Sequence, residues 1–160
     1  RPADYDQPGS VLDIRFGSGN FPGREADRLT VERLVPVASP TLVGNVDWTS
    51  LPLLLVAGAR EMWADWFAAA GMPGHPRRSH RFDSFVAAME AAKAGAGVLL
   101  GSRPLIDAAL ASKAIVTLSG FELSSSSGHF LTRASATQLT RAERDFRLWL
   151  LSRLGGMGSL

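Results

Sequence analysis

The chain has 160 residues, 46% hydrophobic and 20% charged, proportions that are typical of a globular protein. It is long enough for one core or two small lobes, and no apolar run reaches the roughly 18 residues that cross a bilayer, so we expect a soluble protein. The net charge is only +2, and the basic residues are spread along the chain, which argues against direct nucleic-acid binding. The chain has no cysteine, which excludes disulfides and thiolate chemistry.

The first third of the chain alternates apolar runs with turn and helix signals, which indicates an α/β domain. A buried strand is predicted from Val11 to Phe16. The next apolar run, from Leu29 to Val37, leads to Ser39 before a proline, where we expect a helix to begin. A further strand is predicted from Leu51 to Ala57.

The segment from Arg60 to Ala70 carries large side chains at helical spacing, and Gly71 stands where a glycine ends a helix. We expect its aromatic face to belong to the core rather than to a binding box. The residues of that face are Trp63, Trp66, Phe67 and Ala70.

Shorter elements follow in the middle of the chain. We predict an extended piece from His80 to Phe82 and a helix from about Phe85 to Lys93. A strand from Val98 to Leu100 is expected to stop at Gly101, and a helix with Leu105 and Ile106 inward is expected from Arg103 to Ala111.

The last third contains two strands, a loop and a helix. We expect an edge strand from Ala114 to Leu118, a flexible serine-rich loop from Glu122 to Gly128, and a strand from His129 to Thr132. A capping box at Thr140 and Glu143 starts the final helix. One face of that helix carries Phe146, Trp149, Leu150 and Leu154.

The loop that follows the first predicted strand is the strongest binding signal in the sequence. Its residues 17 to 23 include three glycines and a proline, which permit a sharp turn and close backbone approach. The hydroxyl of Ser18 and the amides of Gly17 and Gly19 could cradle a carboxylate or an amide. An ordinary strand-to-loop turn explains the same residues equally well.

Two helix starts carry polar residues with a similar ambiguity. Ser84, with Asp83, stands before a helix whose first amides favour an anion or a hydrogen-bonding ligand, although plain N-capping needs the same residues. Ser39 and Thr41 pose the same choice at the previous helix start.

Catalytic and metal signals are weak. No Gly-x-Ser-x-Gly elbow is present, and the histidines do not stand beside carboxylates at metal-ligand spacing. We therefore expect no enzyme, no metal and no cofactor.

Six segments, taken in order and spacing, carry a family resemblance. They are residues 14–23, 34–40, 60–71, 82–84, 94–105 and 146–150. Together they resemble the effector-binding domain of LysR-type transcriptional regulators, above all the subgroup of the glycine-cleavage activator and the β-lactamase regulator. The resemblance covers roughly residues 10 to 152.

That resemblance implies a periplasmic-binding-protein type II-like fold of two α/β lobes, truncated at its N-terminus. Residues 1–34 would form part of lobe I, 35–115 lobe II, 116–152 the returning segment with the last helix of lobe I, and 153–160 a tail. The chain starts at Arg1 without an initiator Met, so we expect a fragment that lacks the winged helix-turn-helix and the first strand and helix of lobe I.

The resemblance also implies a function. A small effector, such as an amino acid, a carboxylate or a peptidoglycan fragment, would bind between the lobes and modulate DNA binding by the parent protein, which would be a cytoplasmic homodimer or higher oligomer without membrane contact. Ser84 or Phe85 would face the effector, as would His129, where close relatives carry a tyrosine. Asp13 stands where a small apolar residue is usual. The alternative is a solute-binding protein of the same fold, which would need an upstream signal peptide.

Overall fold

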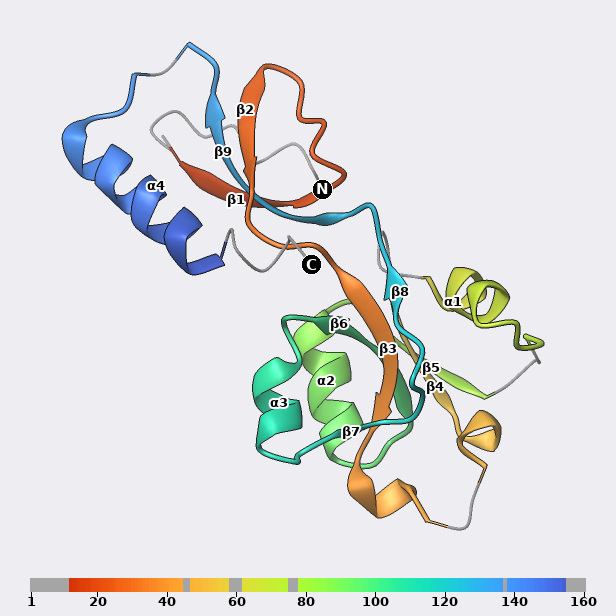
Figure 1. Ribbon diagram of the computed structural model, residues 1–160. Helices are drawn as coiled ribbons and strands as arrows, with labels where there is room; N and C mark the ends of the chain where they lie inside the picture. Colours follow the sequence, from red (N-terminus) through yellow and green to blue (C-terminus); the bar gives the residue numbers. More distant parts are fainter. Residues whose placement is uncertain (1–11, 45–46, 58–61, 75–77, 137, 155–160) are drawn as a thin grey trace. The chain divides into compact units, whose positions relative to one another are not determined.

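The computed structural model describes residues 12–44, 47–57, 62–74, 78–136 and 138–154. The chain divides into two compact units (Figure 1). Unit 1 comprises Arg1–Glu32 and Ser125–Leu160, and unit 2 comprises Arg33–Ser124. Each unit combines a β-sheet with at least one helix, which confirms the α/β class.

Unit 1 is built on a three-stranded antiparallel sheet. Strand β9 (Gly128–Ala134) lies in the centre, between β1 (Asp13–Gly17) and β2 (Arg24–Arg28). Helix α4 (Arg141–Leu154) follows β9 in the chain. The small core contains Leu29, Leu131 and Leu150, with Leu12, Leu151 and Leu154 packed against it. The core therefore joins the helix to the central strand.

Unit 2 is built on a larger mixed sheet with strand order β5-β4-β6-β3-β7, and β8 pairs with β3. Strand β4 runs parallel to its neighbours β5 and β6, while β3 runs antiparallel to β6. The strands are β3 (Arg33–Ala38), β4 (Leu53–Val56), β5 (Ser79–Phe82), β6 (Val98–Arg103), β7 (Val116–Thr117) and β8 (Leu123–Ser124). The helices are α1 (Trp63–Ala69), α2 (Phe85–Lys93), α3 (Asp107–Ala111) and two 3-10 turns, Pro40–Leu42 and Trp48–Ser50.

Helices pack on both faces of the unit 2 sheet, and successive residues of a strand point to opposite faces. Leu54 and Val56 of β4 belong to the core that includes α2, whereas Leu53 belongs to the core that includes α1. The second core contains Trp63, Trp66 and Phe67, all buried, as the sequence predicts. These aromatic residues therefore hold the fold and do not form a binding box.

Several predicted boundaries are confirmed. Helix α2 spans Phe85–Lys93, and Gly71, with φ +67°, follows the end of α1 in the left-handed conformation that favours glycine. At α4 the amide of Thr140 donates to Glu143 Oε2 at 2.7 Å, and the amide of Glu143 donates back to Thr140 Oγ1 at 3.3 Å. This is the predicted capping box. Strand β7 lies at the edge of the sheet, as expected. The first residues of the helix predicted from Arg60 to Ala70 lie outside the described residues.

Three predictions about unit 2 are wrong. Gly101 does not end a strand but lies inside β6, where an added Cβ would stand 2.8 Å from the Ile106 side chain. The helix expected from Arg103 begins only at Asp107, since Arg103 still belongs to β6, and Leu105 is 45% exposed although it was expected inward. The first part of the expected serine loop forms β8, which pairs with β3.

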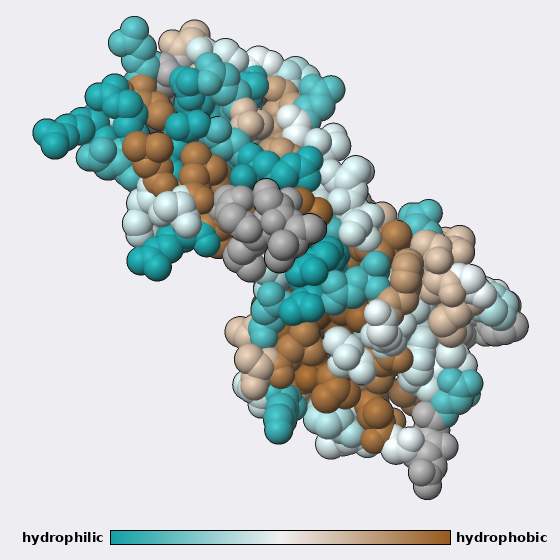
Figure 2. Space-filling view, in the orientation of Figure 1, coloured by the Kyte–Doolittle hydropathy of each residue, from teal (hydrophilic) through white to brown (hydrophobic). Residues whose placement is uncertain are grey.

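Unit 1 departs from expectation in other ways. Strand β2, Arg24–Arg28, was not predicted because four of its five residues are charged. On α4, Leu150 is buried, but Phe146 and Trp149 are 46% and 53% exposed, so the four large residues do not share one buried face. Figure 2 shows apolar residues on the visible surface of this helix.

Candidate functional site

The glycine loop after β1 folds tightly against one aromatic ring. Gly19 has φ +96°, and a Cβ added there would lie 2.9 Å from the ring of Phe130. The ring of Phe21 meets Phe130 edge-on, with centroids 5.7 Å apart. Only glycine fits this position without strain, and the loop holds Ser18 exposed at its tip. The loop therefore has a defined shape and a hydroxyl available to solvent.

His129 is held by a residue that the sequence did not single out. Nδ1 of His129 lies 3.1 Å from Oγ1 of Thr30, and that same oxygen accepts a hydrogen bond from the His129 amide at 3.1 Å. Because the Thr30 oxygen accepts from the amide, its own proton can be donated to Nδ1, which would place the ring proton on Nε2. The imidazole also contacts Phe16, with ring centroids 5.2 Å apart.

The glycine loop and His129 lie close along the strands but on different faces of the sheet. Phe16 pairs with His129 and Gly17 with Gly128, so the end of β1 adjoins the start of β9. Neighbouring side chains in a strand point to opposite faces. The loop packs on Phe130, and the imidazole of His129 therefore points to the other side of the sheet from that ring.

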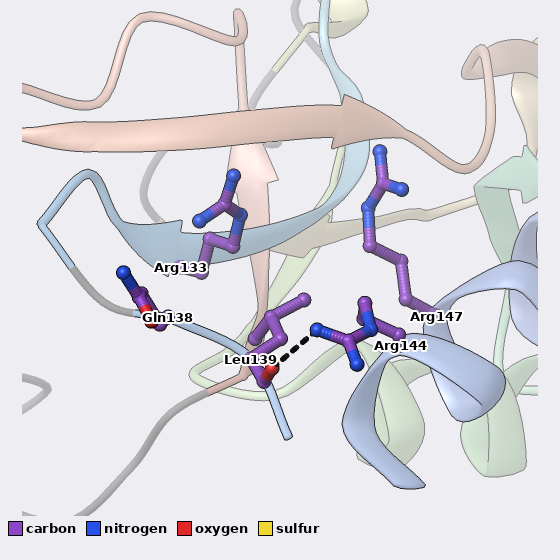
Figure 3. Close-up of a pocket in the computed structure, with 5 residues that line it drawn as sticks. All are labelled: Arg133, Gln138, Leu139, Arg144 and Arg147. Carbon is purple, nitrogen blue, oxygen red and sulfur yellow. Dashed lines mark hydrogen bonds between the residues drawn. The ribbon is translucent and has the colours of Figure 1, made fainter. Parts of the chain in front are cut away.

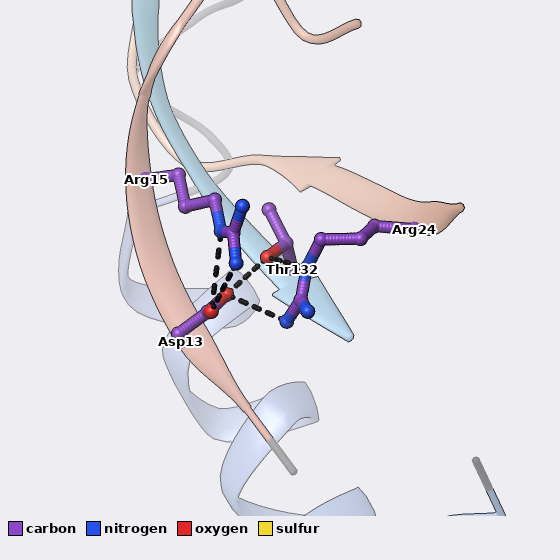
Figure 4. A network of polar contacts seen from close by, with 4 residues as sticks. All are labelled: Asp13, Arg15, Arg24 and Thr132. Carbon is purple, nitrogen blue, oxygen red and sulfur yellow. Dashed lines mark hydrogen bonds and ion pairs between the residues drawn. The ribbon is translucent and has the colours of Figure 1, made fainter. Parts of the chain in front are cut away.

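Figure 4 shows a charged network of Asp13, Arg15, Arg24 and Thr132. It lies on the same face as Phe130, because Arg15 pairs with Phe130 and Asp13 with Thr132. The carboxylate of Asp13 is 3.0 Å from Arg15 Nη2 and 2.9 Å from Arg24 Nη2, and it accepts a hydrogen bond from Thr132. Burial raises the pKa of Asp13, but the hydrogen bonds from Arg15 and Thr132 and the two positive charges outweigh it, so the pKa lies below its usual value. The arginines beside Asp13 therefore stabilise the charged form of its carboxylate.

In unit 2, Ser84 stands at the N-terminus of α2 with its side chain exposed. It occupies the N-cap position, yet its hydroxyl makes no capping hydrogen bond. Phe85, the next residue, is half-buried and packs against the core beneath α2. Plain N-capping therefore does not account for the Ser84 hydroxyl, while Phe85 has a packing role.

Ser39 and Thr41 lie at the other end of α2. Ser39 is 4% exposed and its Oγ caps the Pro40–Leu42 turn, 2.9 Å from Thr41 Oγ1. A Cβ added at Gly95, just beyond α2, would lie 3.4 Å from Thr41 Oγ1. A nine-residue helix is about 13 Å long, so the structure does not bring these two residues to Ser84.

The direction of the parallel strands distinguishes the two ends of α2. Ser84 follows the carboxyl end of β5, and ligands of open α/β sheets gather at the carboxyl ends of the strands. The 3-10 turn that contains Thr41 lies beyond β3, near the amino end of its antiparallel neighbour β6. Of the residues predicted in unit 2, Ser84 has the position that suits a ligand.

Neither a metal site nor a membrane-spanning helix is found among the described residues. Within the ranges that the structure describes, no group of three or more His, Asp or Glu residues is arranged to hold a metal ion. None of the helices described is both long and apolar enough to cross a membrane.

The sequence and the fold are similar to those of known regulators. The HTH-type transcriptional activator AmpR of Pseudomonas aeruginosa is 36% identical over 143 residues, which are 86% of this chain and 48% of that protein. AmpR of Enterobacter cloacae is 33% identical over 147 residues, 88% of this chain and 50% of that protein. The chain thus spans about half the length of these relatives.

A solved structure shows the same similarity. The effector domain of AmpR from Pseudomonas aeruginosa superposes with a TM-score of 0.79 at 34% identity, over 91% of this chain and 73% of that one. These matches favour the regulator over the alternative of a solute-binding protein. The family model described as "LysR substrate binding domain" matches residues 12–155. The chain belongs to the LysR substrate-binding domain family.

Proposed function

We propose that this chain is the small-molecule-sensing part of an AmpR-like transcriptional regulator. It acts by binding alone, without catalysis, and its effector changes how an attached helix-turn-helix module binds an operator. The parent protein works in the cytoplasm as a homodimer or higher oligomer. Family membership and the match to AmpR effector domains support this proposal.

The glycine loop is the observation that carries the proposal within unit 1. Gly17 ends β1 opposite Gly128, and Gly19 lies in the loop that follows, where a Cβ would stand 2.9 Å from the Phe130 ring. Ser18 adds an exposed hydroxyl between them. An array of amides with one hydroxyl suits the carboxylate or amide of an amino acid, a small carboxylate or a peptidoglycan fragment.

Two further residues have supporting roles in this proposal. His129 is a positioning residue: its bonds to Thr30 fix the start of β9, against which the end of β1 and the loop are built. In unit 2, Ser84 is a candidate ligand contact because its hydroxyl is exposed and makes no capping bond. Ser39, Thr41 and Phe85 keep the structural roles described above.

A thermal-shift screen with amino acids, small carboxylates and peptidoglycan fragments tests the proposal. A ligand that binds the folded state raises the unfolding midpoint by mass action. We expect a saturable rise that Ser18→Ala diminishes and that Ser126→Ala, an exposed serine elsewhere in unit 1, leaves unchanged. Equal responses of the two variants, or no shift in a folded sample with any ligand, would overturn the proposed loop site.

A further inference from the structure

Unit 1 contains a basic cavity that the proposed effector site does not use. The cavity has a volume of about 310 Å³ and lies between the end of β9, the segment before α4, and α4 itself (Figure 3). Its lining residues are Arg133, Gln138, Leu139, Arg144 and Arg147, which we call the arginine pocket. No carboxylate is among them. A cavity lined by three guanidinium groups and one amide suits an anion.

Two of the arginines are held in place by carboxylates of β2. Arg147 binds Asp27 through two parallel hydrogen bonds of 2.6 Å, from Nε and Nη2. Arg133 forms an ion pair with Glu25. Such pairs fix the planar guanidinium groups, so an entering ligand would not have to order them. The two carboxylates balance two of the three positive charges.

Arg144 supplies the third charge, and its hydrogen-bonding capacity is largely available. Its Nη1 donates to the backbone carbonyl of Leu139 at 2.9 Å, a contact that is drawn in Figure 3. A guanidinium carries five N–H donors, so this contact orients the group while leaving most of its donors unused by the described residues. The neighbouring Gln138 amide is exposed and adds further donors.

We propose that the arginine pocket binds the oxyanion group of a small molecule, a carboxylate or a phosphate, with Arg144 as the principal contact. Guanidinium groups match both oxyanions by paired, charge-assisted hydrogen bonds. Arg147 and Arg133, each already paired with a carboxylate, form fixed walls of the pocket, and Gln138 can donate to an outer oxygen. None of these residues belongs to the glycine loop, so this site and the proposed effector site can fail independently.

Helix α4 provides a matched control. Arg141 lies one turn before Arg144, its side chain is 92% exposed, and it does not line the pocket. A general attraction of anions to the basic helix would depend equally on the two residues. A built site would depend on Arg144 and not on Arg141.

The test is a ¹⁵N–¹H NMR titration of the 160-residue chain with inorganic phosphate and, separately, with succinate, at constant ionic strength. We expect at least one probe to give saturable shifts at the amides of Gln138, Leu139 and Arg144. Arg144→Gln should weaken that binding about tenfold, the loss of one charge-assisted hydrogen bond, and Arg141→Gln should leave it unchanged.

The two probes identify the source of the oxyanion. Saturation by phosphate alone assigns a phosphorylated ligand, and saturation by succinate alone assigns a carboxylic acid. Gln138→Glu, which introduces a negative charge at an exposed position, gives an independent loss of binding if Arg144→Gln does not fold. The proposal is overturned if neither probe saturates, or if Arg141→Gln weakens binding as much as the pocket variants do.

Discussion

Gly128→Ala should destabilise unit 1 more than any exposed glycine substitution. A Cβ at this position would lie 2.0 Å from the backbone carbonyl oxygen of Thr30, and neither group is the end of a flexible side chain. Relieving the clash requires a backbone shift of about 1 Å, since real Cβ contacts begin at roughly 3 Å. That shift would strain the hydrogen bond from the Leu29 amide to the His129 carbonyl, now 2.8 Å long.

The expected loss combines two effects. Overpacking costs about 1–3 kcal/mol, and each weakened backbone hydrogen bond adds up to about 1 kcal/mol. We therefore expect Gly128→Ala to lower the free energy of unfolding by about 3 kcal/mol. Gly120→Ala, whose Cβ would meet no atom within 4 Å, should match the wild type or gain up to about 1 kcal/mol.

Urea unfolding followed by far-ultraviolet circular dichroism measures both variants. The dependence of the unfolding free energy on urea concentration should be the same in both variants, while the urea concentration at the unfolding midpoint should be lower for Gly128→Ala. Equal midpoints for Gly128→Ala and Gly120→Ala would refute the close approach of Thr30 and Gly128, and with it the anchoring of His129 derived from the same geometry.

Three further predictions concern charge, capping and fluorescence. Asp13→Asn should lower the free energy of unfolding by about 2 kcal/mol at pH 7. Because the pKa of Asp13 is lowered in the folded state, this difference should be present above the ordinary carboxyl pKa and vanish as the pH falls through the folded-state pKa. Urea unfolding at a series of pH values from 7 to 2.5 measures it. Thr140→Ala should cost about 1 kcal/mol by removing the α4 cap, measured by thermal unfolding. Trp149→Phe should change stability by less than about 0.5 kcal/mol and preserve most of the fluorescence change on unfolding, since Trp149 is exposed while Trp63 and Trp66 are buried in unit 2.

Unit 2 was largely predictable from the sequence because its elements follow ordinary hydrophobic periodicity. The aromatic face of α1, the bounds of α2 and the edge position of β7 all follow from spacing and from glycine or cap residues. The prediction that Gly101 ends a strand was wrong because this glycine permits close packing against Ile106 and does not form a turn. A local pattern does not distinguish these two uses of glycine.

Unit 1 was less predictable because long-range charge pairs hold it together. Strand β2 has no apolar alternation, and its Asp27 is satisfied by Arg147, a residue 120 positions later. The Thr30–His129 contact, which joins residues 99 positions apart, is equally invisible in a local window. The glycine loop was recognisable from composition, but the side of the sheet on which it packs follows only from the β1–β9 register.

The most direct test of the central claim is a ¹⁵N–¹H NMR titration of this chain with the compound that gives the largest shift in the thermal screen. We expect saturable changes at the amides of Gly17, Ser18 and Gly19, reduced in Ser18→Ala and retained in Ser126→Ala. Saturable binding that leaves these three amides unchanged would contradict the assignment of the glycine loop as the effector site.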